Sequence, residues 1–180
     1  MAVRAPRAAQ PLPLGFIGLA VASFAFATVQ LGWIGPAQGR TVALSVLFFT
    51  VPVQLLASAA GFVRAEVAPA TGMGVLAGTW AAVALATYSA PPGSTSKGLG
   101  VVLCAAGAAM LVPAAAALAQ PWAAAVMVGA TVRFWSTAAY ELTGSKGWQH
   151  AAGWVGLVVA ALGLAVALLI AVGEVGHDDD

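Results

Sequence analysis

Long apolar segments, separated by short breaks rich in proline, glycine or charge, follow one another along this chain. Each segment has about the 20 residues that a helix needs to cross a hydrocarbon core roughly 30 Å thick. Apolar and polar residues do not alternate strictly within them, which disfavours strands, and backbone groups in lipid must bond inside their own helix. The pattern therefore predicts an all-α membrane protein with six transmembrane helices: Leu14–Trp33, Thr41–Val63, Gly72–Ser89, Gly98–Ala119, Pro121–Leu142 and His150–Val172.

These segments divide the chain into an N-terminal segment (1–13), a six-helix membrane domain (14–173) and an acidic C-terminal tail (174–180). An even number of spans places both termini on one side. Cationic residues are shared equally between the two sides and so do not fix the orientation: Arg4, Arg7 and Arg64 against Arg40, Lys97 and Lys146. The two arginines before the first span favour cytoplasmic termini in a multi-pass protein of the plasma (inner) membrane.

Composition excludes several classes of protein. Hydrophobic residues make up 61% of the chain and charged residues 7%, whereas soluble domains carry about 25% charged residues. The net charge of +1 comes without a cluster of Lys and Arg, so a nucleic-acid partner is not expected. The 21 glycines and many alanines suit close helix contacts. Their small-residue faces exceed what six helices bury internally, which predicts a homo-oligomer in the lipid bilayer.

Enzyme signatures are missing from the sequence. It has no paired-carboxylate site, no His-Glu-x-x-His, no phosphate-binding glycine loop and no Gly-x-Ser-x-Gly. His150 and His177 are too few for a metal cluster, and Cys104 stands alone in an apolar run. We expect neither a catalytic residue, nor a metal, nor a cofactor.

One charge lies deep inside a predicted span. Arg133 follows Pro121 by about twelve residues, roughly 18 Å into the segment, where burial costs about 2.5 to 3.5 kcal/mol. Two interpretations remain open: the guanidinium faces an aqueous path and attracts an anion, or it bonds helix-end carbonyls and a neighbour's carboxylate, that of Glu66 or Glu141. The other candidates for a polar lining are Gln30, Gln54, Glu141 and His150, with the hydroxyls of Thr79, Thr131, Ser136 and Thr137.

Tryptophans fall into two groups. Trp33, Trp122 and Trp148 lie at predicted span ends, where indole rings favour the membrane interface. Trp80 and Trp135 lie within spans. There a ring either narrows a path or packs, and packing is the preferred interpretation for Trp135.

Prolines inside the spans should distort their helices, and closely spaced glycines should allow neighbouring helices to pack tightly. Pro52 and Pro113 lie inside spans, and each removes one helix hydrogen bond and should kink its helix. Gly74 and Gly78 have the spacing of a close helix contact.

Two motifs carry a family resemblance. The stretch Gln10-Pro11-Leu12-Pro13-Leu14-Gly15-Phe16 resembles the opening signature Asn-Pro-Ala-Pro-Leu-Gly-Leu of the acetate uptake transporter family, the succinate-acetate permeases. Near the other end, His150 to Leu157, with Gly153, Trp154 and Gly156, resembles the last helix of that family.

The resemblance implies a cyclic hexamer, cytoplasmic termini and a pore for acetate or succinate in each six-helix protomer. By position, Leu19, Trp80 and Thr131 correspond to the pore constriction. Gln10 and Arg133 depart from the family pattern. Three hypotheses stay open: a monocarboxylate conduit, a channel for neutral solutes such as urea or short amides, and a membrane scaffold subunit without a pore.

Overall fold

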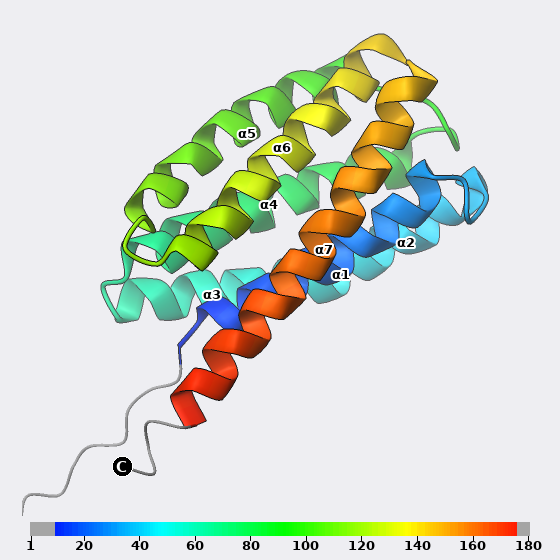
Figure 1. Ribbon diagram of the computed structural model, residues 1–180. Coiled ribbons are helices and arrows are strands. Elements are labelled where there is room, and N and C mark those ends of the chain that lie inside the picture. The colour runs from blue at the N-terminus through cyan, green and yellow to red at the C-terminus, as the bar shows by residue number, and fades with distance from the viewer. Residues whose placement is uncertain (1–9, 176–180) are drawn as a thin grey trace, which may run out of the picture.

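The computed structural model describes residues 10–175, and this part of the chain contains helices and no strand. Arg4, Arg7, His177 and most of the two predicted terminal segments lie outside the described residues. The elements are α1 (Leu12–Gln30), η1 (Pro36–Gln38), α2 (Gly39–Ser45), η2 (Val46–Thr50), α3 (Val51–Val63), α4 (Val67–Ser89), α5 (Lys97–Ala116), α6 (Pro121–Thr143) and α7 (Lys146–Val175) (Figure 1). The prediction of an all-helical protein is confirmed for this range.

Five helices are long and apolar enough to cross a membrane: α1, the continuous segment Pro36–Val63, α4, α5 and residues Lys146–Gly173 of α7. The remaining long helix, α6, has 23 residues and is less apolar than these five. Arg133 and Glu141 both lie on it. Five of the six predicted spans therefore have helices of membrane-crossing length and character.

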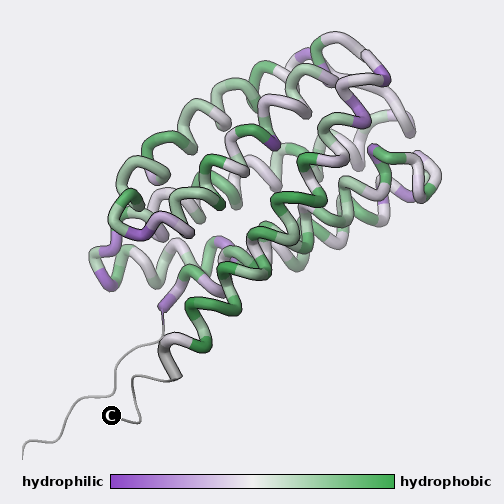
Figure 2. Tube along the Cα trace, in the orientation of Figure 1, coloured by the Kyte–Doolittle hydropathy of each residue, from purple (hydrophilic) through white to green (hydrophobic). Residues whose placement is uncertain are grey.

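The long helices form a closed ring. Helix α1 contacts α7, and contacts then continue through α6, α5 and α4 to α3, which returns to α1. Helix α1 begins at the same end of the bundle at which α7 ends (Figure 1). Hydrophilic residues gather at the two ends of the bundle, and apolar residues cover the length between them (Figure 2). Buried apolar side chains, among them Leu19, Met73 and Leu76, fill the inside of this ring.

The second segment is irregular just before Pro52. A π-helical turn, η2, occupies Val46–Thr50. Proline has no N–H and its ring crowds the preceding turn, so a widened turn is a physical solution at this place. Thr50, the last residue of the turn, donates its hydroxyl to the Gly18 carbonyl at 3.1 Å. The irregularity predicted at Pro52 is thus present, whereas α5 continues past Pro113 to Ala116.

Glycines of α7 allow it to lie close to α1. A Cβ at Gly153 would stand 2.6 Å from Leu31 Cγ. A Cβ at Gly163 would stand 3.2 Å from the Phe16 carbonyl oxygen. A side chain at either position would require its neighbours to shift, so these glycines favour close packing of the first and last helices.

Gly74 and Gly78 differ from each other. A Cβ at Gly74 would lie 3.2 Å from Ser58 Oγ, on the face that α4 turns to α3. Gly78 is exposed and has nothing within 4 Å of such a Cβ. The predicted glycine contact within the protomer is therefore correct at one of the two positions.

The closest backbone approach between α3 and α4 gives a stability prediction. A Cβ at Gly61 would lie 2.5 Å from the Ala70 backbone nitrogen, which cannot move aside as a side chain can. Gly61→Ala should lower the free energy of unfolding by about 1 to 3 kcal/mol. Denaturant titration in mixed micelles, followed by circular dichroism, measures the change.

The matched control is Gly78→Ala, the same substitution in open space. It should leave stability unchanged or raise it by up to about 1 kcal/mol, because alanine favours the helix. Equal stability of the two variants would contradict the close contact between α3 and α4.

A cavity closed by aromatic rings

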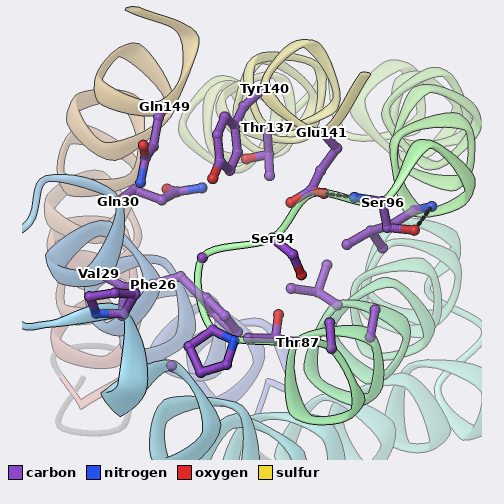
Figure 3. A pocket seen from close by; sticks show the side chains of 18 of the residues that line it. Phe26, Val29, Gln30, Thr87, Ser94, Ser96, Thr137, Tyr140, Glu141 and Gln149 are labelled. Carbon is purple, nitrogen blue, oxygen red and sulfur yellow. Dashed lines mark hydrogen bonds between the residues drawn. The ribbon is translucent and has the colours of Figure 1, made fainter. Parts of the chain in front are cut away.

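A cavity of about 290 Å³ lies at the end of the ring where α1 and α4 finish and α5 and α7 begin. Its upper wall carries the polar side chains of Gln30, Tyr140 and Gln149 (Figure 3). The loop between α4 and α5 forms part of its border, with Ser94 turned inward (Figure 3). The cavity thus has a polar mouth, at the end opposite to the one where α1 begins.

Three aromatic rings from three helices close the inner end of the cavity. Phe26 of α1 stacks on Trp80 of α4, with ring centroids 5.8 Å apart and planes 13° apart. Phe134 of α6 meets Trp80 edge to face at 5.9 Å. All three side chains line the cavity and are buried. Such offset and T-shaped pairs add to apolar burial, whereas the buried Nε1 of Trp80 has no hydrogen-bond partner among the described residues.

The three predicted constriction residues lie on different helices of the ring. Trp80 lines the cavity, whereas Leu19 and Thr131 are buried outside its lining. The Thr131 hydroxyl donates to the Met127 carbonyl in its own helix at 3.2 Å. The structure thus brings Trp80 together with Phe26 and Phe134, two rings that sequence reasoning missed although both stand inside predicted spans.

Arg133 is 2% exposed and reaches the cavity from between α6 and α7. Its Nη1 donates to Thr137 Oγ1 at 2.7 Å and to the Ala152 carbonyl at 2.9 Å. Its Nε has no partner. A Cβ at Gly156 of α7 would lie 2.9 Å from that Nε. The guanidinium therefore lies against the backbone of α7 at Gly156, where an added side chain would displace it.

Of the structural interpretation of Arg133, the bond to a backbone carbonyl is present, whereas the pairing with Glu66 or Glu141 is not. Glu66 forms an ion pair with Arg64 at 2.6 Å. Glu141 Oε2 accepts a hydrogen bond from the backbone N–H of Ser96 at 2.7 Å (Figure 3). Both carboxylates bind groups nearer the ends of the bundle, so the hydrogen-bond partners of Arg133 are neutral.

Glu141 fixes the edge of the cavity. It anchors Ser96, whose own hydroxyl accepts the N–H of Leu99 and caps the start of α5. One carboxylate therefore ties the end of α6 to the loop that borders the cavity.

Three of the predicted polar residues lie away from the cavity. Gln54 is fully buried and its Nε2 donates to the Gly15 carbonyl at 3.5 Å, between α3 and α1. The Thr79 hydroxyl donates to the Val75 carbonyl at 2.7 Å, and His150 is exposed. Gln30, Thr137 and Glu141, which belong to the same predicted set, line the cavity together with Arg133.

Trp135 packs, as predicted. Its Nε1 donates to the Cys104 carbonyl at 3.1 Å, and a Cβ at Gly107 would stand 2.4 Å from that nitrogen. The ring therefore seals the contact between α5 and α6.

A second pocket, of about 300 Å³, lies at the opposite end and is bordered by Gln10, Glu66 and Gln120. Apolar side chains of the core, fully buried, include Leu19, Met73, Leu76 and Met127. Neither pocket has these four in its lining.

The fold matches a solved structure, that of the bacterial acetate channel SatP, with a TM-score of 0.75. The match covers 96% of this chain and 95% of the channel chain, at 21% sequence identity. No protein-family model and no curated protein sequence matches the chain. The chain therefore shares the fold of that channel, and its five apolar helices make it a multi-pass membrane protein.

Proposed function

We propose that the chain belongs to the acetate uptake transporter family and passes short monocarboxylates, with acetate as the principal solute and succinate as a further one. The observation that carries this proposal is the cavity that narrows to the Phe26, Trp80 and Phe134 rings inside a closed helix ring. The same fold in an acetate channel supports it.

Selection by size follows from the rings. A solute that leaves the polar mouth must shed water to pass between aromatic side chains, and a small solute loses less hydration than a large one. Hydrophobic constrictions gate channels in this way. Displacement of the rings, together with Leu19 and Met73 beyond them, would then open the path.

Charge selects the sign of the solute. Arg40, Arg133 and Lys146 line the cavity, against the single carboxylate of Glu141. A fixed cation close to a low-dielectric constriction lowers the barrier for an anion more than it would in water. The lining therefore favours carboxylates over cations.

In this proposal α6 is the sixth span, since it completes the ring between α5 and α7. Large apolar side chains on the outside of the bundle suit lipid and neighbouring protomers; Phe48 is 76% exposed and Val63 89%. We propose a cyclic hexamer in the plasma membrane with cytoplasmic termini. The cavity then opens on the outer side.

Flux into liposomes tests the function. Vesicles containing the purified protein should take up labelled acetate faster than labelled urea. Arg133→Gln removes the charge but keeps donors, and should lower acetate flux tenfold or more, about 1.4 kcal/mol on the barrier, while any urea leak is kept. Faster urea than acetate would favour a neutral-solute channel, and no flux of either would favour a scaffold subunit.

Trp80→Ala should widen the constriction and raise succinate flux relative to acetate flux. Removing a ring packed against Phe26 and Phe134 should also cost about 3 to 5 kcal/mol of stability, so expression and monodispersity are checked first. Trp135→Ala is the matched control, because that ring lies between α5 and α6 outside the cavity. An unchanged succinate-to-acetate ratio in folded Trp80→Ala would assign Trp80 to packing alone.

Native mass spectrometry from mild detergents should show six copies, because the apolar outer faces of one protomer need partners or lipid. A monomer in every detergent tried would contradict the hexamer.

A further inference from the structure

Uncharged polar side chains from three helices meet at one wall of the cavity. Gln30 is the last residue of α1, Tyr140 lies in the last turn of α6, and Gln149 lies in the first turn of α7. Their polar ends point toward one another at the cavity (Figure 3). Helix α7 contacts both α1 and α6, so the folded ring brings these residues together.

This wall offers the cavity hydrogen-bond donors more than acceptors. Gln30 Oε1 is buried without a partner among the described residues, and the Nε2 end of its amide turns inward (Figure 3). Gln149 Oε1 accepts a hydrogen bond from Lys146 Nζ at 2.9 Å, so its Nε2 is the end left for other partners. The Tyr140 hydroxyl makes no hydrogen bond within the described part of the chain. The N–H and O–H groups of the wall therefore lack acceptors.

Burial makes these unused donors costly. Tyr140 is 9% exposed and Gln30 8%, and a polar group that is shielded from bulk water needs a partner. The cavity of about 290 Å³ has room for one, since a water molecule takes about 30 Å³. A solute of the size of acetate therefore fits beside the wall. An occupant that brings acceptors without donors satisfies the wall best.

We propose that Gln30, Tyr140 and Gln149 form a binding site for the carboxylate of a short monocarboxylate, held by uncharged donors. The identity of the ligand rests on the proposed function. An ionised carboxylate has acceptors only, and its hydrogen bonds are stronger than those between neutral groups. Acetamide and urea carry N–H groups of their own, which would face the donors of the wall. The site therefore recognises the pattern of donors and acceptors in addition to charge.

The charges beside the wall agree with an anion. Lys146, Gln149 and Ala152 follow one another on one face of α7 at a spacing of three residues. Lys146 bonds the Gln149 amide, and Arg133 bonds the Ala152 carbonyl. Glu141, the one acidic residue of the lining, accepts the backbone N–H of Ser96. Gln149 thus lies between the positions of two cations.

Tyr140→Phe tests the site by removing one hydroxyl while the ring stays. Saturation-transfer NMR on the methyl signal of acetate measures the Kd for the purified protein in detergent. The Kd should rise about tenfold, the effect of losing one hydrogen bond to a charged acceptor. The thermal unfolding midpoint without acetate should equal that of the wild type, because the hydroxyl has no partner among the described residues. Acetamide should bind the wild type more weakly than acetate does.

Tyr88→Phe is the matched control, since the other tyrosine of the chain is 46% exposed and lies outside the cavity lining. It should bind acetate as the wild type does. Gln149→Met is a second test variant. It keeps the length of the side chain and removes the N–H donors, so acetate binding should weaken here too.

Wild-type acetate affinity in folded Tyr140→Phe, or in folded Gln149→Met if the first variant does not fold, would overturn the site. Equal affinity of the wild type for acetate and acetamide would overturn it as well and assign the wall to water. Liposome flux on the same preparations separates the two proposals. Acetate flux without the predicted change in Kd would leave the conduit standing and remove the site. Acetate binding that depends on Tyr140, but no flux, would leave the site and remove the conduit.

Discussion

Lipid offers no partner for a polar group, and the rest of this structure follows from that constraint. Backbone groups bond within helices, and side chains that remain polar turn to carbonyls of neighbouring helices. Thr50 and Gln54 of the second segment both donate to carbonyls of α1, and Ser58 donates to the Ala70 carbonyl of α4 at 2.6 Å. Because these polar side chains of the ring wall are hydrogen-bonded to neighbouring helices, few polar groups are left to contact a solute.

The polar groups that do reach the interior are concentrated at one end. Helices finish at this end, and water can enter there. Three polar residues line the cavity and are buried or half-buried: Gln30, Tyr140 and Gln149. Arg133 lies deeper than these residues. The backbone of α7, as well as its own helix, holds its guanidinium there. Aromatic rings begin where this polar zone stops. The cavity lining thus combines polar groups, the guanidinium of Arg133 and the three aromatic rings.

The lengths of the apolar segments were sufficient to predict the helices, because hydrocarbon thickness dictates those lengths. Helix ends were less predictable: α4 begins at Val67 and α7 at Lys146, ahead of the predicted Gly72 and His150. The helices continue beyond the apolar run, where capping and loop contacts decide their ends, and hydropathy carries no signal for these.

The direction in which each side chain faces was the weakest part of the sequence prediction. In helices that are apolar on all sides, no hydrophobic stripe marks the inner face. Gln54 and Thr79 were therefore placed on the path, and Phe26 and Phe134 were missed. Trp80 and Arg133 were found because their size and charge were unusual at that depth. This signal can be read from the sequence without knowing which way a side chain faces.

Arg133 and Gly156 are 23 residues apart in the sequence but in contact in the structure, so the residue at one position restricts the residues that the other can carry. A side chain at 156 would force the guanidinium to shift, whereas a glycine there does no harm if position 133 carries a shorter residue. In a lineage that acquires this pair, the glycine can therefore precede the arginine, but the reverse order passes through a protein with a displaced charge in its membrane interior. The order of the two substitutions is thus constrained by geometry, and the arginine, once established, prevents the glycine from drifting.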